Sequence, residues 1–204
     1  MSARAQLEDL SRRLTTREAR GRAYMVVPIT PGAGASFICA RLAANAARES
    51  ARPVWLFDLD FGANPQSTRT RMNGAAYSAD LGAERFWRTE PEGAGRLALR
   101  KVDAAPVLIS VFERDPGEVR RVTFASAPAY WDRVRDACGL ALIDIPCDSP
   151  AATALCADVD GVILVGDAKT TTRAMADSLA DEIEHAGGEV LGVILNRAPE
   201  QATR

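Results

Sequence analysis

The sequence predicts one α/β domain: a three-layer, doubly wound, mostly parallel sheet covered by helices on both faces. Unbroken aliphatic runs recur along the chain, and helical stretches lie between several of them. Continuous apolar runs are typical of strands buried on both faces, and alternation with helices is typical of parallel sheets. The length of 204 residues suits a single domain with one substantial core.

The expected strands and helices follow from apolar runs and from the spacing of apolar residues. We expect strands at the apolar runs 23–29, 54–57, 107–112, 140–145, 161–165 and 190–195. Helices are expected over 5–17, 36–49, 129–138 and 172–185. The first has leucines at helical spacing (Leu7, Leu10 and Leu14), and the last ends at Gly187 and Gly188. We assign residues 1–22 to an N-terminal helix and lead-in, and 23–204 to the main domain; glycines and prolines leave most of 66–135 unassigned.

Composition excludes several classes of protein. The chain is 47% hydrophobic and 25% charged, with a net charge of -2, which argues against a disordered chain, a nucleic-acid binder and a protein inserted in a membrane. Residues 1–21 are polar and arginine-rich, unlike a signal peptide. We therefore expect a cytoplasmic protein.

The cysteines and the histidine show no metal signature. Cys39, Cys138, Cys147 and Cys156 form no Cys-x-x-Cys pair, and His185 is the only histidine. We expect the cysteines to be small buried apolar residues.

The loop from Thr30 to Ser36 has the pattern of a phosphate-binding loop between a strand and a helix. Its glycines let backbone N–H groups turn inward, and the following helix presents its positive end to an anion. Asp58, Asp60 and Asp144 end later aliphatic runs, where carboxylates can reach a metal at the sheet edge. The alternatives are structural: Ser36 would cap its helix, and the aspartates would close turns.

These motifs resemble the deviant-Walker P-loop ATPases, which include the ParA/MinD proteins, and more closely the cytoplasmic tyrosine kinases of bacterial capsule and exopolysaccharide export. The Walker A loop is matched by residues 31–36, the Asp-x-Asp motif by residues 55–60, and Walker B by residues 142–146. The later segments 159–165, 170–172 and 191–197 also match. The resemblance covers most of the chain from Tyr24 to Arg197.

The resemblance implies a role for each matched residue. It implies nucleotide binding, ATP or ADP with magnesium, by Pro31, Gly32, Ala33, Gly34, Ala35, Ser36, Phe37 and Asn196, of which Asn196 would contact adenine. It implies that Ser36, Asp58 and Asp144 hold the metal, and that Asp58 and Asp60 are the catalytic carboxylates, active or vestigial.

The departures from the family pattern concern catalysis. Ala35 stands where the family has the Walker lysine, and Thr30 where the ParA/MinD group has a second one. That lysine stabilises charge on the transferred phosphoryl group, so its loss predicts weak or absent turnover. Its loss also leaves nucleotide binding open: the backbone donors of the loop remain for a phosphate, while the affinity should fall, so weak or absent binding is the alternative. No tyrosine follows Tyr130 in this sequence, so we expect no autophosphorylation on a C-terminal tyrosine cluster like that of the kinases. Lys169 is a candidate substitute cation, against the alternative of a solvated surface lysine.

Three functions remain open. The first is a catalytically weak or inactive regulatory or scaffold protein of exopolysaccharide synthesis or export. It would act through a protein partner, such as a membrane polysaccharide co-polymerase that recruits it to the inner membrane, or as a homo-oligomer. The second is an active ATPase or tyrosine kinase that uses another cation, such as an arginine. The third is a ParA/MinD-like positioning ATPase.

Two further features bear on partners. Phe86, Trp87, Tyr130 and Trp131 are a candidate interface, with the hydrophobic core as the alternative. Glu8, Arg12 and Arg13 only loosely match the oligomerisation motif of the kinases, so the sequence leaves ring assembly open.

Overall fold

The computed structural model describes residues 3–15, 19–103, 105–114 and 117–198. These residues form an eight-stranded sheet in the order β10-β9-β1-β8-β2-β6-β5-β3, together with a separate ribbon, β4-β7. The six strands from β10 to β6 pair in parallel, and β5 and β3 add antiparallel strands at one edge. The predicted α/β, mostly parallel fold is confirmed.

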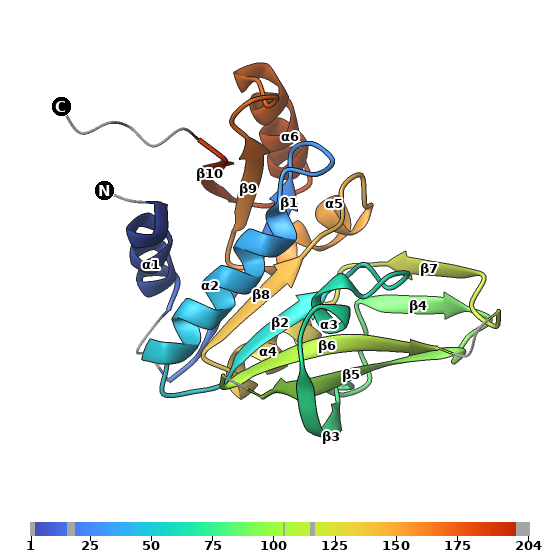
Figure 1. Ribbon diagram of the computed structural model, residues 1–204. Coiled ribbons are helices and arrows are strands. Elements are labelled where there is room, and N and C mark those ends of the chain that lie inside the picture. Colours follow the sequence, from blue (N-terminus) through green and yellow to red (C-terminus); the bar gives the residue numbers. More distant parts are fainter. Residues whose placement is uncertain (1–2, 16–18, 104, 115–116, 199–204) are drawn as a thin grey trace.

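The ten predicted elements lie close to their expected positions (Figure 1), although the expected end of the first helix, at residues 16–17, lies outside the described residues. The strands are β1 (Arg22–Pro28), β2 (Val54–Asp58), β3 (Met72–Ser78), β4 (Trp87–Glu90), β5 (Gly95–Val102), β6 (Val107–Arg114), β7 (Arg121–Phe124), β8 (Leu140–Asp144), β9 (Val162–Asp167) and β10 (Val190–Asn196). The helices are α1 (Ala3–Leu14), α2 (Ala35–Glu49), α3 (Pro65–Thr68), α4 (Pro128–Ala137), α5 (Ala151–Leu155) and α6 (Arg173–His185), with a 3-10 turn at Cys156–Asp158. The structure adds β3, β4, β5, β7, α3 and α5, which the sequence did not predict.

Helices cover the sheet on both faces, as Figure 1 shows. One face packs against α2, and α1 lies on α2 through Leu7, Leu10 and Leu14. The other face packs against α4, α5 and α6, where Tyr130, Leu155 and Ile183 enter the core. The apolar residues of β1 therefore alternate between two cores: Met25 faces one and Val26 the other.

The candidate aromatic interface is wrong. Phe86, Trp87, Tyr130 and Trp131 are all buried, and they pack edge to face around Phe57 and the β4-β7 ribbon. These side chains are the core between β2, α4 and the ribbon. No partner protein can reach them in the folded chain.

The cysteines are free among the described residues. Cys39, Cys138 and Cys156 are buried, as expected, whereas Cys147, in the turn after β8, is only half-buried. No described helix has the length and apolarity needed to cross a membrane.

Candidate nucleotide site at the carboxyl edge of the sheet

The loop after β1 is compact and depends on two glycines. Gly32 and Gly34 have φ values of 75° and 88°, in the left-handed region that other residues rarely adopt. A Cβ at Gly34 would lie 2.4 Å from the Asn196 amide nitrogen, so this position also needs the absence of a side chain. The turn is closed by the Ala33 N–H, which donates to the Thr30 carbonyl.

The structure rules out the alternative that Ser36 caps α2. The residue that caps α2 is Gly34, and no side chain accepts a hydrogen bond there. Ser36 lies inside the first turn, close enough to Asp144 to lower the pKa of that carboxyl. The helix end therefore keeps N–H groups without a side-chain cap, which is the arrangement that binds anions.

Asp58 and Asp144 come together because they end neighbouring parallel strands. They are direct partners in the β2-β8 register and are 1% and 2% exposed. Asp58 accepts hydrogen bonds from the N–H groups of Asp60 and Gln66, at 3.1 and 2.8 Å. One oxygen of Asp144 accepts from the Gln66 carboxamide at 2.6 Å, while the other is buried without a partner.

Asp60 has the role of a turn residue. Its carboxylate accepts from the Ala63 N–H at 3.0 Å, and its carbonyl accepts from the Asn64 N–H at 2.7 Å. The turn carries the chain from β2 to α3. The alternative that an aspartate closes a turn therefore describes Asp60 better than Asp58 or Asp144.

Burial raises the pKa of both inner carboxyls. Desolvation is the main cause for each, and it raises the pKa of Asp58 to about 7 and the pKa of Asp144 to about 6. The charge of Asp144 raises the pKa of Asp58 further. Hydrogen bonds from Gln66 and Ser36 oppose the rise at Asp144. Two buried carboxylates without a cation are therefore an unfavourable pair at neutral pH.

We expect Asp144→Asn to stabilise the protein at high pH only. The folded state binds the Asp144 proton more tightly than the unfolded state, so the native protein loses stability as pH rises from about 4 to about 6. A rise in pKa from 3.8 to about 6 corresponds to about 3 kcal/mol. Urea unfolding should show that gain at pH 8 and none at pH 4. The exposed Glu118→Gln serves as control, and an equal gain at both pH values would contradict the assignment.

Residues at the end of β10 hold the loop from outside. The Asn196 amide donates to the Ala33 carbonyl at 2.9 Å, and the Arg197 guanidinium donates to the Gly32 carbonyl at 3.0 Å. Arg197 also pairs with Asp167 at the end of β9. The two loop carbonyls thus point toward β10, which leaves the opposite side of the loop for a ligand.

The remaining predicted positions are spread around this loop. Ala35 is buried and packs with Ile38 and Leu42, and Phe37 is 60% exposed. Lys169 is exposed, and its backbone N–H donates to Asp167. Pro31 lies exposed at the tip of the loop.

Sequence reasoning missed two of the residues that organise the site. Gln66 is the second residue of a helix of four residues, which is too short to give a periodic pattern. Arg197 ends the matched segment 191–197 but was given no role, and its positive φ of 58° was not visible in the sequence. The signal available for both was their position, beside Pro65 and Asn196.

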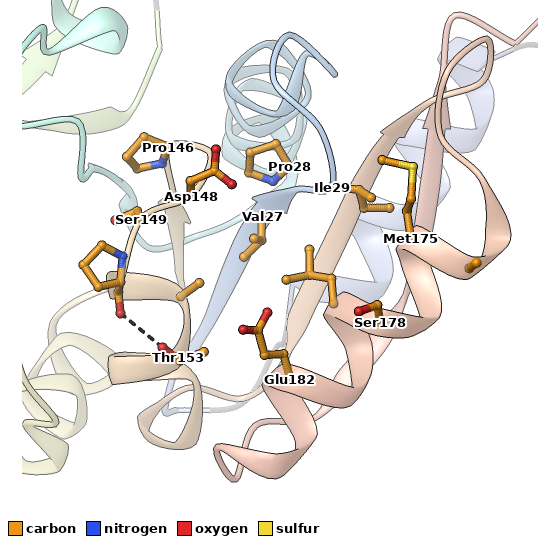
Figure 2. Close-up of a pocket in the computed structure, with 14 residues that line it drawn as sticks. Val27, Pro28, Ile29, Pro146, Asp148, Ser149, Thr153, Met175, Ser178 and Glu182 are labelled. Carbon is orange, nitrogen blue, oxygen red and sulfur yellow. Dashed lines mark hydrogen bonds between the residues drawn. The ribbon is translucent and has the colours of Figure 1, made fainter.

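A cavity of about 730 Å³ lies on the other side of β1, beside α6. Figure 2 shows Met175, Ser178 and Glu182 lining it from α6, opposite the ends of β1 and β8. None of the predicted site residues lines it. The loop and the two carboxylates therefore form a site separate from this cavity.

Comparisons with known proteins find the same fold in several solved structures. No protein-family model matches the chain, and no curated protein matches it by sequence. Among solved structures, the kinase domain of VpsO is 18% identical over 96% of each chain, with a TM-score of 0.61. The kinase domain of the Escherichia coli tyrosine kinase ETK is 17% identical, over 92% of this chain and 71% of that one, with a TM-score of 0.57.

Two further structures extend the comparison to nucleotide-binding proteins. The Pyrococcus furiosus cell division ATPase MinD is 18% identical, over 89% of this chain and 74% of that one, with a TM-score of 0.60. A nucleotide-binding protein from Archaeoglobus fulgidus, solved in complex with ADP, is 17% identical over 93% and 70%, with a TM-score of 0.50. At these identities the similarity is one of fold. The chain has the P-loop NTPase-like α/β fold of bacterial tyrosine-kinase domains and MinD.

Proposed function

We propose that this chain binds ATP or ADP at the loop of residues 31–36 and acts as a regulatory or scaffold protein with weak or absent phosphoryl transfer. The proposal rests on one contrast: the loop has the backbone geometry of a phosphate site but lacks the cation that turnover needs. Its glycine geometry and the uncapped start of α2 suit a phosphate, whereas position 35 holds a buried alanine in place of a cation. Phosphate binding depends on the glycines and the start of α2, which are present, whereas turnover depends on the cation at position 35, which is replaced by alanine.

The oxygen ligands fit magnesium. Ser36 lies near Asp144, and one buried oxygen of Asp144 has no partner in the protein. Hydroxyl and carboxylate oxygens are the ligands that magnesium prefers, usually with several waters retained. When bound, the ion would neutralise charge on the phosphates; Ser36 and Asp144 would hold it, and Asp58 would orient its water.

We propose exopolysaccharide synthesis or export as the setting and another protein as the partner, such as a membrane polysaccharide co-polymerase; a homo-oligomer is the alternative. The sequence resemblance and the similarity of fold to tyrosine-kinase domains support the setting. Leu191, Val193 and Leu195 are three of the six large apolar side chains that are exposed among the described residues. They lie at alternate positions on the edge strand β10, a surface suited to contact with another chain.

A second candidate function is an active ATPase or kinase that takes its cation from an arginine. Arg197 favours it, because its guanidinium already lies against the Gly32 carbonyl of the loop. To reach a phosphate bound on the opposite side of the loop, the guanidinium would have to leave the Gly32 carbonyl and Asp167. This function predicts measurable turnover in the native sequence, whereas the leading proposal predicts turnover near background.

Calorimetry with ADP and ATP, with and without magnesium, tests the leading proposal. We expect saturable binding that Gly34→Ala lowers at least 10-fold, since the new Cβ would meet Asn196 and strain the loop. Gly93→Ala is the matched control. Gly93 has a similar φ of 79°, and nothing lies within 4 Å of the added Cβ, so this variant has the same kind of backbone strain at a position outside the loop. Absence of binding by the native chain, or equal loss in both variants, would overturn the proposal.

A further inference from the structure

The cavity beside α6 has no part in the proposed nucleotide chemistry. Its volume of about 730 Å³ is within the range of about 300–1,000 Å³ that ligand sites occupy. Its floor is the end of β1, and its walls are α6, the loop after β8 and the start of α5. Figure 2 shows side chains from these elements around one shared space. The fold therefore leaves a groove between two helices, a common place for a ligand or for a segment of a partner protein.

Part of the lining is apolar. Val27, Ile29 and Leu179 supply this part together with Met175, which is 40% exposed and is one of the six large apolar side chains that are exposed among the described residues. Covering such side chains removes apolar surface from water, which is favourable. The flexible thioether of Met175 can adapt to the shape of an occupant. An occupant that fits this cavity therefore has an apolar part.

The charge that lines the cavity has one sign. Asp148 and Glu182 are acidic, and none of the described lining residues is a lysine or an arginine. Figure 2 shows Asp148 in the loop after β8 and Glu182 on the α6 wall, with the open space between them. In the part of the chain that the structure describes, neither carboxylate has an ion-pair partner. The cavity therefore attracts a cation and repels a phosphate.

The basic residues nearest in sequence to α6 and β10 are already paired elsewhere. Arg173, at the start of α6, pairs with Asp177, which does not line the cavity. Arg197, after β10, pairs with Asp167. The chain has 25 basic and 27 acidic residues, so its cations are numerous, yet the described residues place none of them in this cavity.

The cavity and the nucleotide loop share two segments of backbone. Ile29 lines the cavity, and Thr30, the next residue, begins the loop. Pro146 lines the cavity two residues after Asp144. The Ile29 N–H donates to the Val165 carbonyl at 2.8 Å, which fixes this segment to β9. An occupant of the cavity therefore lies against the segments that carry the loop and the inner carboxylate.

We infer that this cavity binds a segment of a partner protein that carries lysine or arginine together with apolar side chains. The cation pairs with Asp148 and Glu182, and the apolar side chains cover Ile29, Leu179 and Met175. A small free cation would leave the apolar part uncovered, and an acidic ligand would be repelled, so charge and apolar area together select a basic segment. The inference rests on the proposed function, in which a protein partner takes part, and deepens it by naming the surface and the chemistry of that partner.

The probe for this site is a fluorescent helical peptide with arginines and leucines on one face; its twin has glutamates in place of the arginines. Fluorescence anisotropy should show saturable binding of the arginine peptide and none of the twin. Glu182→Gln and Asp148→Asn should each weaken binding about 5-fold, the upper scale for one solvent-accessible ion pair. Glu184→Gln is the matched control, because it removes the same charge from an exposed position of the same helix that does not line the cavity.

A second variant tests the apolar part and the charge together. Met175→Lys places a cation in the cavity and removes an apolar contact, so we expect it to abolish binding of the arginine peptide. Tyr77→Lys makes a similar change at a 54% exposed position outside the cavity and should leave the affinity unchanged.

Several outcomes would overturn the docking site: no binding of the arginine peptide by the native chain, equal binding of the glutamate twin, or an equal loss in Glu184→Gln. Sedimentation velocity addresses the alternative occupant. A native dimer that Met175→Lys dissociates would assign the cavity to a second copy of this chain instead. Calorimetry with ADP on the same samples keeps the two proposals apart: a native chain that binds no ADP defeats the nucleotide function, whereas the peptide results decide the cavity.

Discussion

Ala35→Lys is expected to raise ATP turnover about 100-fold above that of the native chain, the scale on which one preorganised donor changes kcat. The native loop has its glycine geometry, its open helix end and its inner carboxylates, and it has no cation at position 35. Position 35 already has helical backbone, which a lysine adopts without strain. The measurement is phosphate release from ATP with magnesium in excess.

Ala35→Met is the matched control, because it adds similar length without charge. We expect Ala35→Met to stay at background, which would assign the gain to the ammonium group. If the native chain itself shows turnover that falls to background in Asp58→Asn and Asp144→Asn, the second candidate function is correct and the leading proposal is not. If Ala35→Lys binds ATP and still shows no turnover, other catalytic parts have also been lost.

The parallel strands could be predicted because burial on both faces leaves a simple pattern. The runs at β1, β2, β8 and β9 are mostly apolar, and nearly all of their residues are buried in the sheet. Much of the region 66–135 could not be predicted, because β4 and β7 are short strands whose exposed positions carry polar side chains. Their order in the sequence also does not show that they pair with each other.

The site likewise has one part that the sequence could predict and one that it could not. The meeting of Asp58 and Asp144 could be predicted, since the ends of parallel strands lie at one edge of a sheet. The contacts of Gln66 could not, because they depend on how Asn64 anchors a four-residue helix to β6. The aromatic residues were ambiguous for a related reason: a tryptophan in a short amphipathic segment suits an interface and a core equally well, and only the packing around Phe57 decides between them.

Trp131→Ala is expected to destabilise the protein by about 3–5 kcal/mol, as large-to-small substitutions of aromatic core residues do. Trp131 is fully buried, with ring centroids 5.3 Å from Phe57 and 4.9 Å from Phe86. Because these rings join α4 to β2 and to the chain entering β4, the cavity would open between three elements. The measurement is the free energy of unfolding in urea, with the exposed Tyr77→Ala as the control that should change it by less than about 0.5 kcal/mol.

Trp131→Phe separates packing from hydrogen bonding at the same position. The indole N–H of Trp131 is buried without a hydrogen-bond partner, so its removal relieves a desolvated donor while the phenyl ring keeps much of the contact area. We therefore expect Trp131→Phe to lose clearly less stability than Trp131→Ala. A loss in Trp131→Ala as small as that of Tyr77→Ala would contradict the buried position and restore the interface interpretation. A full loss in Trp131→Phe would instead mean that the N–H has a partner in solution, such as a buried water.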